Sequence, residues 1–346
     1  MSKATKKQWK RLFEMMNGFV HTQTLAAACE LGLFAYLAAN PGAGRQQIQA
    51  ALSLSEHSTR ILMLACCATE LVRRDARTLG YFNSDLVAMT LLPGSPECAA
   101  PFALFTNKIM ERCGMHLAQC LREQRNAALD REFPGEGATL YERLGHYPEL
   151  ARLFQEAMGF YSRTSYSLDQ LREFREIRRL LDVGGGNGSN AVKLCRRFRR
   201  LRVTVMELPK GCEIGRGYVA ERGLGDRIDF AERDMFAAPF PTGCDGVLLA
   251  HVTGIFARES VAVLYRKAFD CLPEGGKLIV WSPAANDLET GGIEAAKLSL
   301  YFLTTASGVG AAWSFEIQQG LLRQCGFRDI VLHEGRREHA MIVATK

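Results

Sequence analysis

The spacing of apolar residues along the chain changes once, near residue 175. Before that point apolar residues recur every three to four positions, which is the period of a helix with one buried face. We therefore expect the first half to be mostly helical. Two segments carry apolar residues that should face a core. One has Leu25, Cys29, Leu33 and Leu37, and the other has Ile61, Leu64, Ala65 and Ala68.

Residues 71–84 interrupt the helical pattern, because β-type residues flank a polar turn and predict a small hairpin. Helices followed by such a hairpin suggest a winged helix, so a transcription regulator has to be considered. The helix that would enter a DNA groove, residues 55–70 (SEHSTRILMLACCATE), is apolar over most of its surface. We interpret it as a buried helix and expect no nucleic-acid role.

After residue 175 short apolar runs alternate with helix-like segments, a pattern typical of a parallel sheet with crossover helices. The end of the chain, residues 329–346, has two further β-type runs around a charged turn, which predict an antiparallel hairpin at one edge. The runs that predict parallel strands are residues 178–183, 202–208, 228–234, 246–252 and 276–282.

The length and net charge of the chain bear on the number of domains and on the class of partner. A chain of 346 residues exceeds what one hydrophobic core usually organises, so we expect two domains. The net charge of +6 could indicate a polyanionic partner. The longest basic cluster, RRFRR at residues 196–200, falls at the end of a predicted helix, where cations suit the helix dipole. We therefore expect no nucleic-acid partner.

The eleven cysteines are scattered and no pair has the C-x-x-C spacing of a zinc or redox site. We expect free thiols in a reducing cytosol and no metal site. No window reaches the roughly 18 apolar residues of a membrane span, and the amino terminus lacks a signal-peptide cleavage pattern. The sequence therefore predicts a soluble, cytoplasmic protein without membrane contact.

The strand at residues 178–183 runs directly into a glycine-rich loop, in the stretch LLDVGGGNGSNA (180–191). Glycine at positions 184, 185, 186 and 188 lets the chain turn tightly from strand to helix and approach a ligand closely. The free N–H groups of the following helix can bind a pyrophosphate or a carboxylate. The spacing Gly186-x-Gly188-x-x-Ala191 also satisfies a dinucleotide fingerprint, so NAD remains a competing cofactor.

Two acidic residues follow the next two predicted strands. Glu207 comes nineteen residues after Gly188, where a carboxylate can accept hydrogen bonds from both ribose hydroxyls. Asp234 can accept a hydrogen bond from an exocyclic amine, and Met235 and Phe236 offer apolar flanks for a purine. Together with the glycine loop they predict an adenosine pocket, and leave open whether the glycines hold a pyrophosphate or an amino-acid tail.

At this point the chain resembles the S-adenosylmethionine-dependent methyltransferases, specifically the O-methyltransferase family of plant phenylpropanoid and bacterial natural-product enzymes. The resemblance covers nearly the whole chain. It rests on LFQEAMGFYS (153–162), LLDVGGGNG (180–188), VMELP (205–209), RDMF (233–236), LPEGGKLIV (272–280) and LLRQCGF (321–327).

The resemblance implies an α/β fold in three parts. A Rossmann-like S-adenosylmethionine-binding domain would occupy residues 176–346, with a mostly parallel sheet and an antiparallel terminal hairpin. A helical connector at 101–175 would line the pocket. A mainly helical, winged-helix-like domain at 1–100 would form a homodimer, which agrees with the apolar helical faces of that segment.

Site residues carry over by position. Asp182, Gly184, Gly185 and Gly186 would contact the methionine end of the cofactor, and Glu207 would contact the ribose. Asp234, Met235 and Phe236 would contact the adenine. Further cofactor contacts would be Ser162, Leu208 and Ala250. A small, flat aromatic acceptor would meet Phe154, Met158, Phe160, Tyr161, His251, Trp281, Tyr301, Phe302 and Trp313, although such aromatic residues are also ordinary core residues.

The chain departs from the family at the catalytic base. Gly254 occupies the position of the family's catalytic histidine, and Ser282 and Ala312 occupy those of the two acidic residues that orient it in plant members. His251 lies three residues upstream and is the one candidate for a shifted base. A histidine at a strand end is also a common packing residue.

Methyl transfer needs chiefly a nucleophile held about 3 Å from the methyl carbon with water excluded. An acidic phenol, a heterocyclic nitrogen, a thiolate or an electron-rich ring carbon needs little help from a base. Our leading hypothesis is therefore a homodimeric methyltransferase of secondary-metabolite or pigment biosynthesis. The alternatives are a family member that binds the cofactor without transferring its methyl, and a winged-helix regulator or scaffold that kept the fold.

Overall fold

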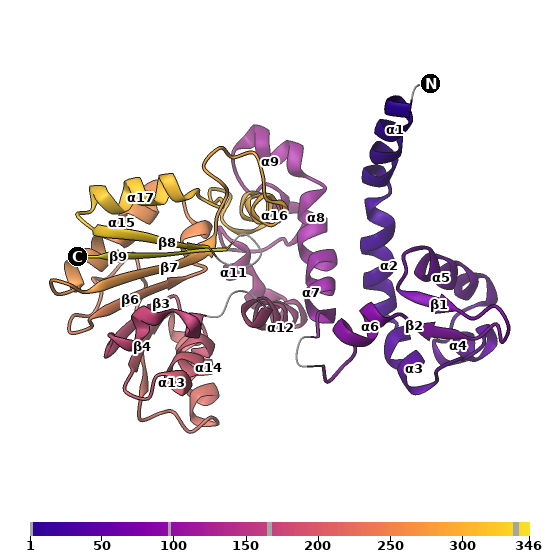
Figure 1. Cartoon of the computed structure of the whole chain (residues 1–346), viewed down its shortest axis with the longest axis horizontal. Helices are drawn as coiled ribbons and strands as arrows, with labels where there is room; N and C mark the ends of the chain where they lie inside the picture. The colour runs from indigo at the N-terminus through magenta and orange to yellow at the C-terminus, as the bar shows by residue number, and fades with distance from the viewer. Residues whose placement is uncertain (1–2, 96–97, 165–167, 335–338) are drawn as a thin grey trace. The chain divides into compact units, whose positions relative to one another are not determined.

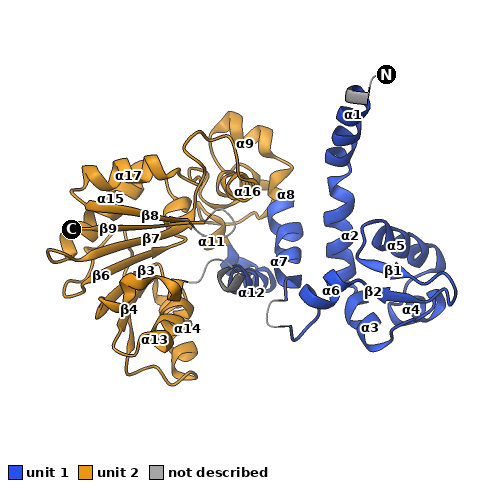
Figure 2. Cartoon of the chain, in the orientation of Figure 1, with its two compact units in different colours: residues 1–112, 144–164 blue, residues 113–143, 165–346 orange. Residues whose placement is uncertain are grey.

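The computed structural model describes residues 3–95, 98–164, 168–334 and 339–346. The chain divides into two compact units, one of residues 1–112 and 144–164 and the other of residues 113–143 and 165–346 (Figure 2). The first unit is helical with one small hairpin, and the second is built on a seven-stranded sheet (Figure 1).

The first unit has a core beneath its hairpin. Strands β1 and β2 pair antiparallel, with Val72 opposite Asn83, which confirms the predicted hairpin. The core beneath it includes Leu33, Ile48 and Met63. The elements are α1 (Lys3–Met16), α2 (Gly18–Glu30), α3 (Leu33–Ala39), α4 (Arg45–Ala51), α5 (Glu56–Ala68), β1 (Val72–Arg74), β2 (Tyr81–Asn83), α6 (Asp85–Thr90), α7 (Ala100–Phe105), η1 (Thr106–Glu111), η2 (Leu144–His146) and α12 (Pro148–Thr164).

Helix α5 corrects one expectation from the sequence. Ser55 caps it by accepting a hydrogen bond from the backbone N–H of Ser58 at 3.0 Å. Its buried face consists of Thr59, Leu62, Met63 and Cys66. Ile61 and Leu64, which the spacing assigned to the core, are 54% and 69% exposed. The predicted buried face was wrong. This helix is apolar on several sides, so the spacing of its apolar residues alone did not determine which side is buried.

A second expectation joined Leu25 and Cys29 with Leu33 and Leu37 in one helical segment. The chain instead breaks there, because Gly32 takes a left-handed φ of 72° between α2 and α3. Leu33 and Leu37 are buried on α3, while Leu25 and Cys29 on α2 are only partly buried. A glycine in this conformation ends a helix without the strain that a side chain would add.

The sheet of the second unit has the order β5-β4-β3-β6-β7-β9-β8. All neighbouring pairs from β5 to β7 are parallel, and the terminal hairpin of β8 and β9 adds two antiparallel strands. This confirms the predicted fold class. The strands are β3 (Arg179–Val183), β4 (Arg202–Glu207), β5 (Ile228–Glu232), β6 (Gly246–Ala250), β7 (Lys277–Pro283), β8 (Arg328–Glu334) and β9 (His339–Thr345).

Helices cover both faces of this sheet (Figure 1). One face packs against α13 and α14, and the other packs against α15 and α17. The elements of the unit besides the strands are α9 (Leu117–Glu123), α10 (Ala128–Glu132), α11 (Leu140–Arg143), η3 (Leu168–Gln170), η4 (Arg172–Arg175), α13 (Ser189–Arg197), α14 (Pro209–Ala220), η5 (Thr253–Ile255), α15 (Arg258–Cys271), α16 (Ile293–Tyr301), η6 (Phe302–Ala306) and α17 (Phe315–Gln324), with α8 (Arg112–Gly114) at the border of the two units.

The strand order positions the ligand site. Strand β3 pairs with β4 on one side and with β6 on the other, so the order of the strands reverses at β3. In an open parallel sheet, ligands bind beyond the carboxyl ends of the strands at such a reversal. The glycine loop directly follows β3. Among the described residues, no helix combines the length and apolar composition needed to cross a bilayer.

Candidate active site

The glycine loop after β3 has the backbone geometry that only glycine adopts easily. Gly184, Gly186 and Gly188 have φ angles of 68°, 58° and 78°, and Gly188 caps the start of α13. A Cβ atom on Gly185 would lie 2.6 Å from Oδ2 of Asp182. The loop therefore passes close over the Asp182 carboxyl group, and a side chain at position 185 would displace one of the two.

Asp182 is buried within this loop region, with 1% of its surface exposed. Neither of its carboxyl oxygens accepts a hydrogen bond from a residue that the structure describes. Burial, and to a smaller extent the charge of Glu207, raises the pKa of Asp182 to about 7. A buried carboxylate without a partner is costly, so this group fits a cationic ligand such as an α-ammonium.

Glu207 ends β4 and is tied to the glycine loop. Its Oε2 accepts a hydrogen bond from the backbone N–H of Gly186 at 3.0 Å, and its Oε1 accepts one from the N–H of Leu208 at 2.8 Å. The side chain is partly exposed, so further lone pairs remain accessible to hydroxyl donors. The structure thus brings together the loop and the first acidic residue that the sequence singled out.

Asp234 lies two residues beyond the end of β5, whereas the sequence placed it within the strand. Its Oδ1 accepts a hydrogen bond from the N–H of Phe236 at 2.7 Å, which fixes a turn. The ring of Phe236 contacts that of Phe256, with centroids 4.8 Å apart. A Cβ on Gly184 would lie 3.2 Å from Cε of Met235. The turn after β5 therefore lies beside the glycine loop.

Lys267 on α15 anchors this turn from behind, and sequence reasoning did not identify it. Its ammonium group donates hydrogen bonds to the carbonyl oxygens of Met235, Phe236 and Ala238 at 2.8, 2.6 and 2.9 Å. An ammonium has three protons, so these bonds satisfy it completely. No local signal distinguishes Lys267 from other lysines, because its partners are about thirty residues away.

His251 follows Ala250 at the end of β6 in a left-handed conformation, with a φ of 58°. Its backbone N–H donates to the carbonyl oxygen of Trp281 at 2.7 Å. Its ring lies 4.4 Å from the ring of Trp281 and 5.1 Å from that of His339, measured between centroids. Burial, together with His339, lowers the pKa of His251 to about 3. The imidazole is therefore neutral and weakly basic near pH 7.

Gly254 lies in η5, and the space beside it is filled. A Cβ at this position would lie 2.8 Å from Cε2 of Phe302 and 3.3 Å from the carbonyl oxygen of Ala311. Phe302 begins η6, a short π-helix of the kind that often marks functional sites. Ser282 and Ala312 are both buried, at 2% and 5% exposure. The phenyl ring thus occupies the space into which a side chain at position 254 would extend.

The remaining predicted acceptor residues belong to both units, and each group is described within its own unit. In the second unit, Tyr301 and Phe302 have rings 5.6 Å apart, and Nε1 of Trp313 donates to the carbonyl oxygen of Phe256 at 3.1 Å. In the first unit, α12 carries Phe154, Met158, Phe160, Tyr161 and Ser162. There, Tyr161 stacks on Phe102 at 5.6 Å and Phe154 meets Phe105 at 5.8 Å. The side chain of Ser162 lies outside the described residues.

Comparison with known proteins gives consistent matches along the chain. Residues 115–328 match the model of an O-methyltransferase domain, and residues 13–93 match that of an O-methyltransferase dimerisation domain. L-tyrosine C(3)-methyltransferase of Streptomyces lavendulae is 31% identical over 94% of this chain and 89% of that protein. 3-Hydroxy-5-methyl-1-naphthoate 3-O-methyltransferase of Streptomyces sahachiroi is 30% identical over 86% and 84%. The crystal structure of human N-acetylserotonin methyltransferase in complex with SAM superposes with a TM-score of 0.87 at 25% identity, over 100% of this chain and 99% of that one.

Proposed function

The chain belongs to the O-methyltransferase family and is an S-adenosylmethionine-dependent methyltransferase, and on that premise we propose that it methylates a small aromatic or heterocyclic acceptor without the family's usual histidine base. S-adenosylmethionine, rather than NAD, is therefore the cofactor. When bound, it supplies an electrophilic methyl group. The observation that carries the proposal is the position of Phe302 beside Gly254.

The geometry of the loops supports the cofactor contacts that we propose. The unpartnered carboxyl group of Asp182 would receive the ammonium of the methionine end, and the backbone of Gly184–Gly186 would lie against the same end. Glu207 and its neighbour Leu208 would receive the ribose, and Ala250, at the end of β6, would be a further contact. Asp234, Met235 and Phe236 receive the adenine in the turn that Lys267 anchors.

Three features support transfer without a dedicated base. A Cβ atom at position 254 would lie 2.8 Å from the ring of Phe302, so a longer side chain there would require that ring to move. Ser282 and Ala312 provide no carboxylate to orient a base. The neutral imidazole of His251 would bind an incoming proton too weakly to act as an efficient base near pH 7, because its pKa is lowered to about 3. These features favour an acceptor that is nucleophilic by itself.

The chain's own contribution is then to hold the acceptor in line with the methyl group and to exclude water. Buried aromatic residues such as Trp281 and Tyr301 suit a flat ring. The names of the two Streptomyces relatives describe methylation of an aromatic ring carbon and of a hydroxyl on a naphthoate. They support an aromatic acceptor in secondary-metabolite or pigment biosynthesis.

The proposal is tested with a series of phenols of graded acidity. Methyl transfer from labelled S-adenosylmethionine is measured from pH 5 to 10 in the wild-type protein. If the acceptor's own ionisation controls the rate, the midpoint of the pH profile moves with the pKa of each phenol. A midpoint that stays constant across the series would show that a group on the protein accepts the proton.

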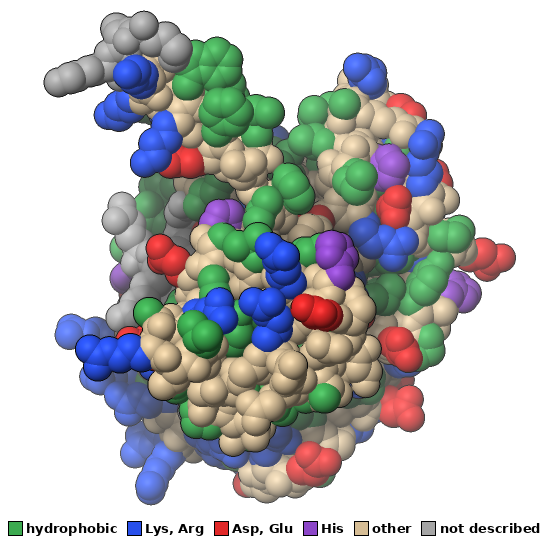
Figure 3. Space-filling view, turned by 90° about the vertical axis from the view of Figure 1, so that its right-hand side faces the viewer, with side chains coloured by type: hydrophobic (Ala, Val, Ile, Leu, Met, Phe, Trp, Pro, Cys, Tyr) green, Lys and Arg blue, Asp and Glu red, His purple; other side chains and the backbone are tan. Residues whose placement is uncertain are grey.

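We also propose that residues 1–100 form a homodimer. The match of residues 13–93 to a dimerisation domain supports it. Exposed apolar side chains on the amino-terminal helix support it as well, because Trp9, Phe13 and Met16 are 48%, 53% and 61% exposed. Figure 3 shows hydrophobic side chains on the surface of this face of the molecule. Light scattering at micromolar concentration should give twice the 38.4 kDa mass of the chain. A monomer that persists as the concentration rises contradicts this.

We propose a cytoplasmic location. All eleven cysteines lie in the described part of the chain and are free thiols. Most are buried, and burial raises the pKa of Cys66 to about 12 and that of Cys195 to about 11, which keeps these thiols protonated and unreactive. Free thiols of this kind are typical of a reducing compartment. Fractionation of cells that express the protein, followed by immunoblotting, tests the location.

A further inference from the structure

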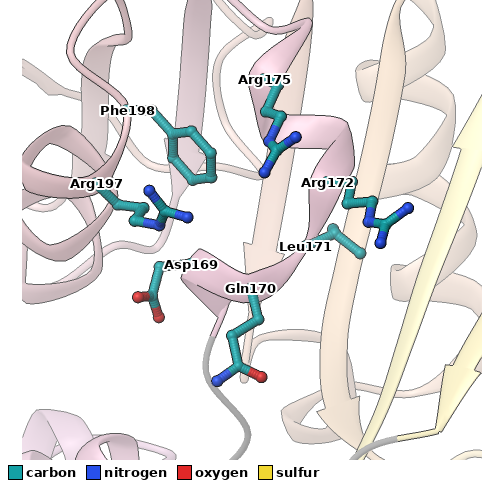
Figure 4. A pocket seen from close by; sticks show the side chains of 7 residues that line it. All are labelled: Asp169, Gln170, Leu171, Arg172, Arg175, Arg197 and Phe198. Atoms are coloured by element: carbon teal, nitrogen blue, oxygen red, sulfur yellow. The ribbon is translucent and has the colours of Figure 1, made fainter.

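A separate pocket of about 390 Å³ lies in the second unit, at the far end of α13 from the glycine loop. Arginines from two different elements line it, namely Arg172 and Arg175 of η4 and Arg197 at the end of α13. Figure 4 shows the guanidinium groups of Arg175 and Arg197 directed toward the hollow beside Phe198, with Arg172 on its rim. The pocket is open to solvent, and because its lining carries three arginines and one carboxylate, that of Asp169, its net charge is positive.

The neighbouring carboxylates do not neutralise these arginines. Asp169 pairs with Lys193 at 3.4 Å, Glu173 lies 3.2 Å from His333, and Glu176 pairs with Lys277 at 3.7 Å. Among the described residues, none of the three arginines has an ion pair or a side-chain hydrogen bond, and the one contact of this group is Arg197 over the ring of Phe198 at 5.8 Å. Positive charge therefore accumulates in the pocket.

The helix dipole explains only part of this arrangement. A cation at the end of α13 is favourable next to the last carbonyl groups, which accounts for Arg197. Arg172 and Arg175 belong to η4, which precedes β3, so the dipole of α13 does not explain why a second element places two more cations at the same pocket. All three arginines are exposed, so water and salt screen most of their mutual repulsion, and an anion bound between them would remove the rest.

We propose that this pocket binds the phosphate group of a small molecule. The planar guanidinium group matches the oxygen geometry of phosphate, and three arginines suit a dianion better than a single carboxylate. The volume exceeds that of a bare phosphate, and the partly buried ring of Phe198 offers a surface for an organic group. The ligand class is therefore a phosphate monoester. This site is independent of methyl transfer.

The full-length protein is first saturated with S-adenosylhomocysteine, so that the glycine loop is occupied. It is then titrated in a calorimeter at pH 7.5 and low salt with phenyl phosphate and, separately, with inorganic phosphate. We expect saturable binding of phenyl phosphate with a dissociation constant below about 1 mM. Arg175→Gln and Arg197→Gln should each weaken it at least about tenfold, through loss of one charge-assisted contact.

Arg199→Gln and Arg200→Gln are the matched controls, because these exposed arginines follow the same helix and do not line the pocket. Each control should change the dissociation constant less than twofold, and all four variants should keep the wild-type unfolding temperature. Absence of saturable binding, or equal weakening in the controls, overturns the proposal. If phenyl phosphate binds more tightly than inorganic phosphate, and Phe198→Leu reduces that difference, the ligand is a phosphate ester. If the two bind with equal affinity, the site is supported with free phosphate as its ligand.

Discussion

Asp182→Asn should stabilise the cofactor-free protein while it weakens cofactor binding. Burial raises the pKa of Asp182 from 3.8 to about 7, and neither of its oxygens has a partner among the described residues. In the unfolded chain the carboxyl group titrates near its ordinary value. The folded state therefore holds a proton that the unfolded state has already released, and stability falls as the pH rises from about 4 to about 7.

The magnitude follows from the pKa. A shift of one unit corresponds to about 1.36 kcal/mol, so the carboxylate lowers the free energy of unfolding by about 4 kcal/mol above pH 7. Asparagine is nearly the same size as protonated aspartate and does not ionise. The variant should match the wild type at pH 4 and exceed it increasingly up to pH 7. If relaxation of the site halves the effect, about 2 kcal/mol corresponds to a rise of about 4–8 °C in unfolding temperature.

The assay is thermal unfolding of carefully stripped, cofactor-free protein between pH 4 and 8.5, with Asp270→Asn on the exposed end of α15 as a control. Calorimetry with S-adenosylhomocysteine at pH 8 should show at least a tenfold loss of affinity in Asp182→Asn, because the amide cannot pair with an ammonium group. A stability difference that does not vary with pH, or a variant less stable than the wild type at pH 8.5, would refute the reasoning.

Three further predictions concern the same site. Glu207→Ala should weaken S-adenosylhomocysteine at least about tenfold in calorimetry, since a charge-assisted hydrogen bond contributes about 1.5–3 kcal/mol; unchanged affinity would contradict the cofactor assignment. His251→Ala should lower kcat less than about tenfold, whereas loss of a true general base would lower it by about 10² to 10⁴. Because the pKa of His251 is about 3, the variant should not lose a limb near pH 6.5 from its pH–rate profile. A loss beyond a hundredfold with cofactor affinity intact would make His251 the base. Gly254→His should not raise kcat and should lower stability by about 1–3 kcal/mol, because its Cβ would lie 2.8 Å from the ring of Phe302; a faster, equally stable variant would contradict this.

The α5 helix shows why part of the fold could not be predicted. A helix that is apolar on one side has one possible buried face, but α5 is apolar on several sides. The spacing of Ile61 and Leu64 was as good as that of Leu62 and Cys66, and only the packing against the hairpin selected the second pair. The exposed pair lies on the surface of the segment that matches the dimerisation domain.

The sequence by itself determined the architecture and an adenosine-type cofactor site, and its resemblance to a known family distinguished S-adenosylmethionine from NAD. Buried parallel strands are continuous apolar runs, and a loop that must turn with positive φ after such a run needs glycine, so both features are visible in local sequence. Glu207 and Asp234 were also visible in local sequence, because each is an acidic residue at the end of an apolar run. The resemblance to the family also aligned Gly254 with the position of the usual histidine base, which stays a prediction.

Only the tertiary structure decided what lies beside Gly254 and how the turn after β5 is held. Phe302 lies 48 residues from Gly254, and Lys267 is about thirty residues from the turn it anchors, so neither pair leaves a periodic or local signal. The raised pKa of Asp182 and the lowered pKa of His251 depend on burial and on charges from other strands. Desolvation is a property of the packed site, because it arises only when distant segments exclude water from the same group.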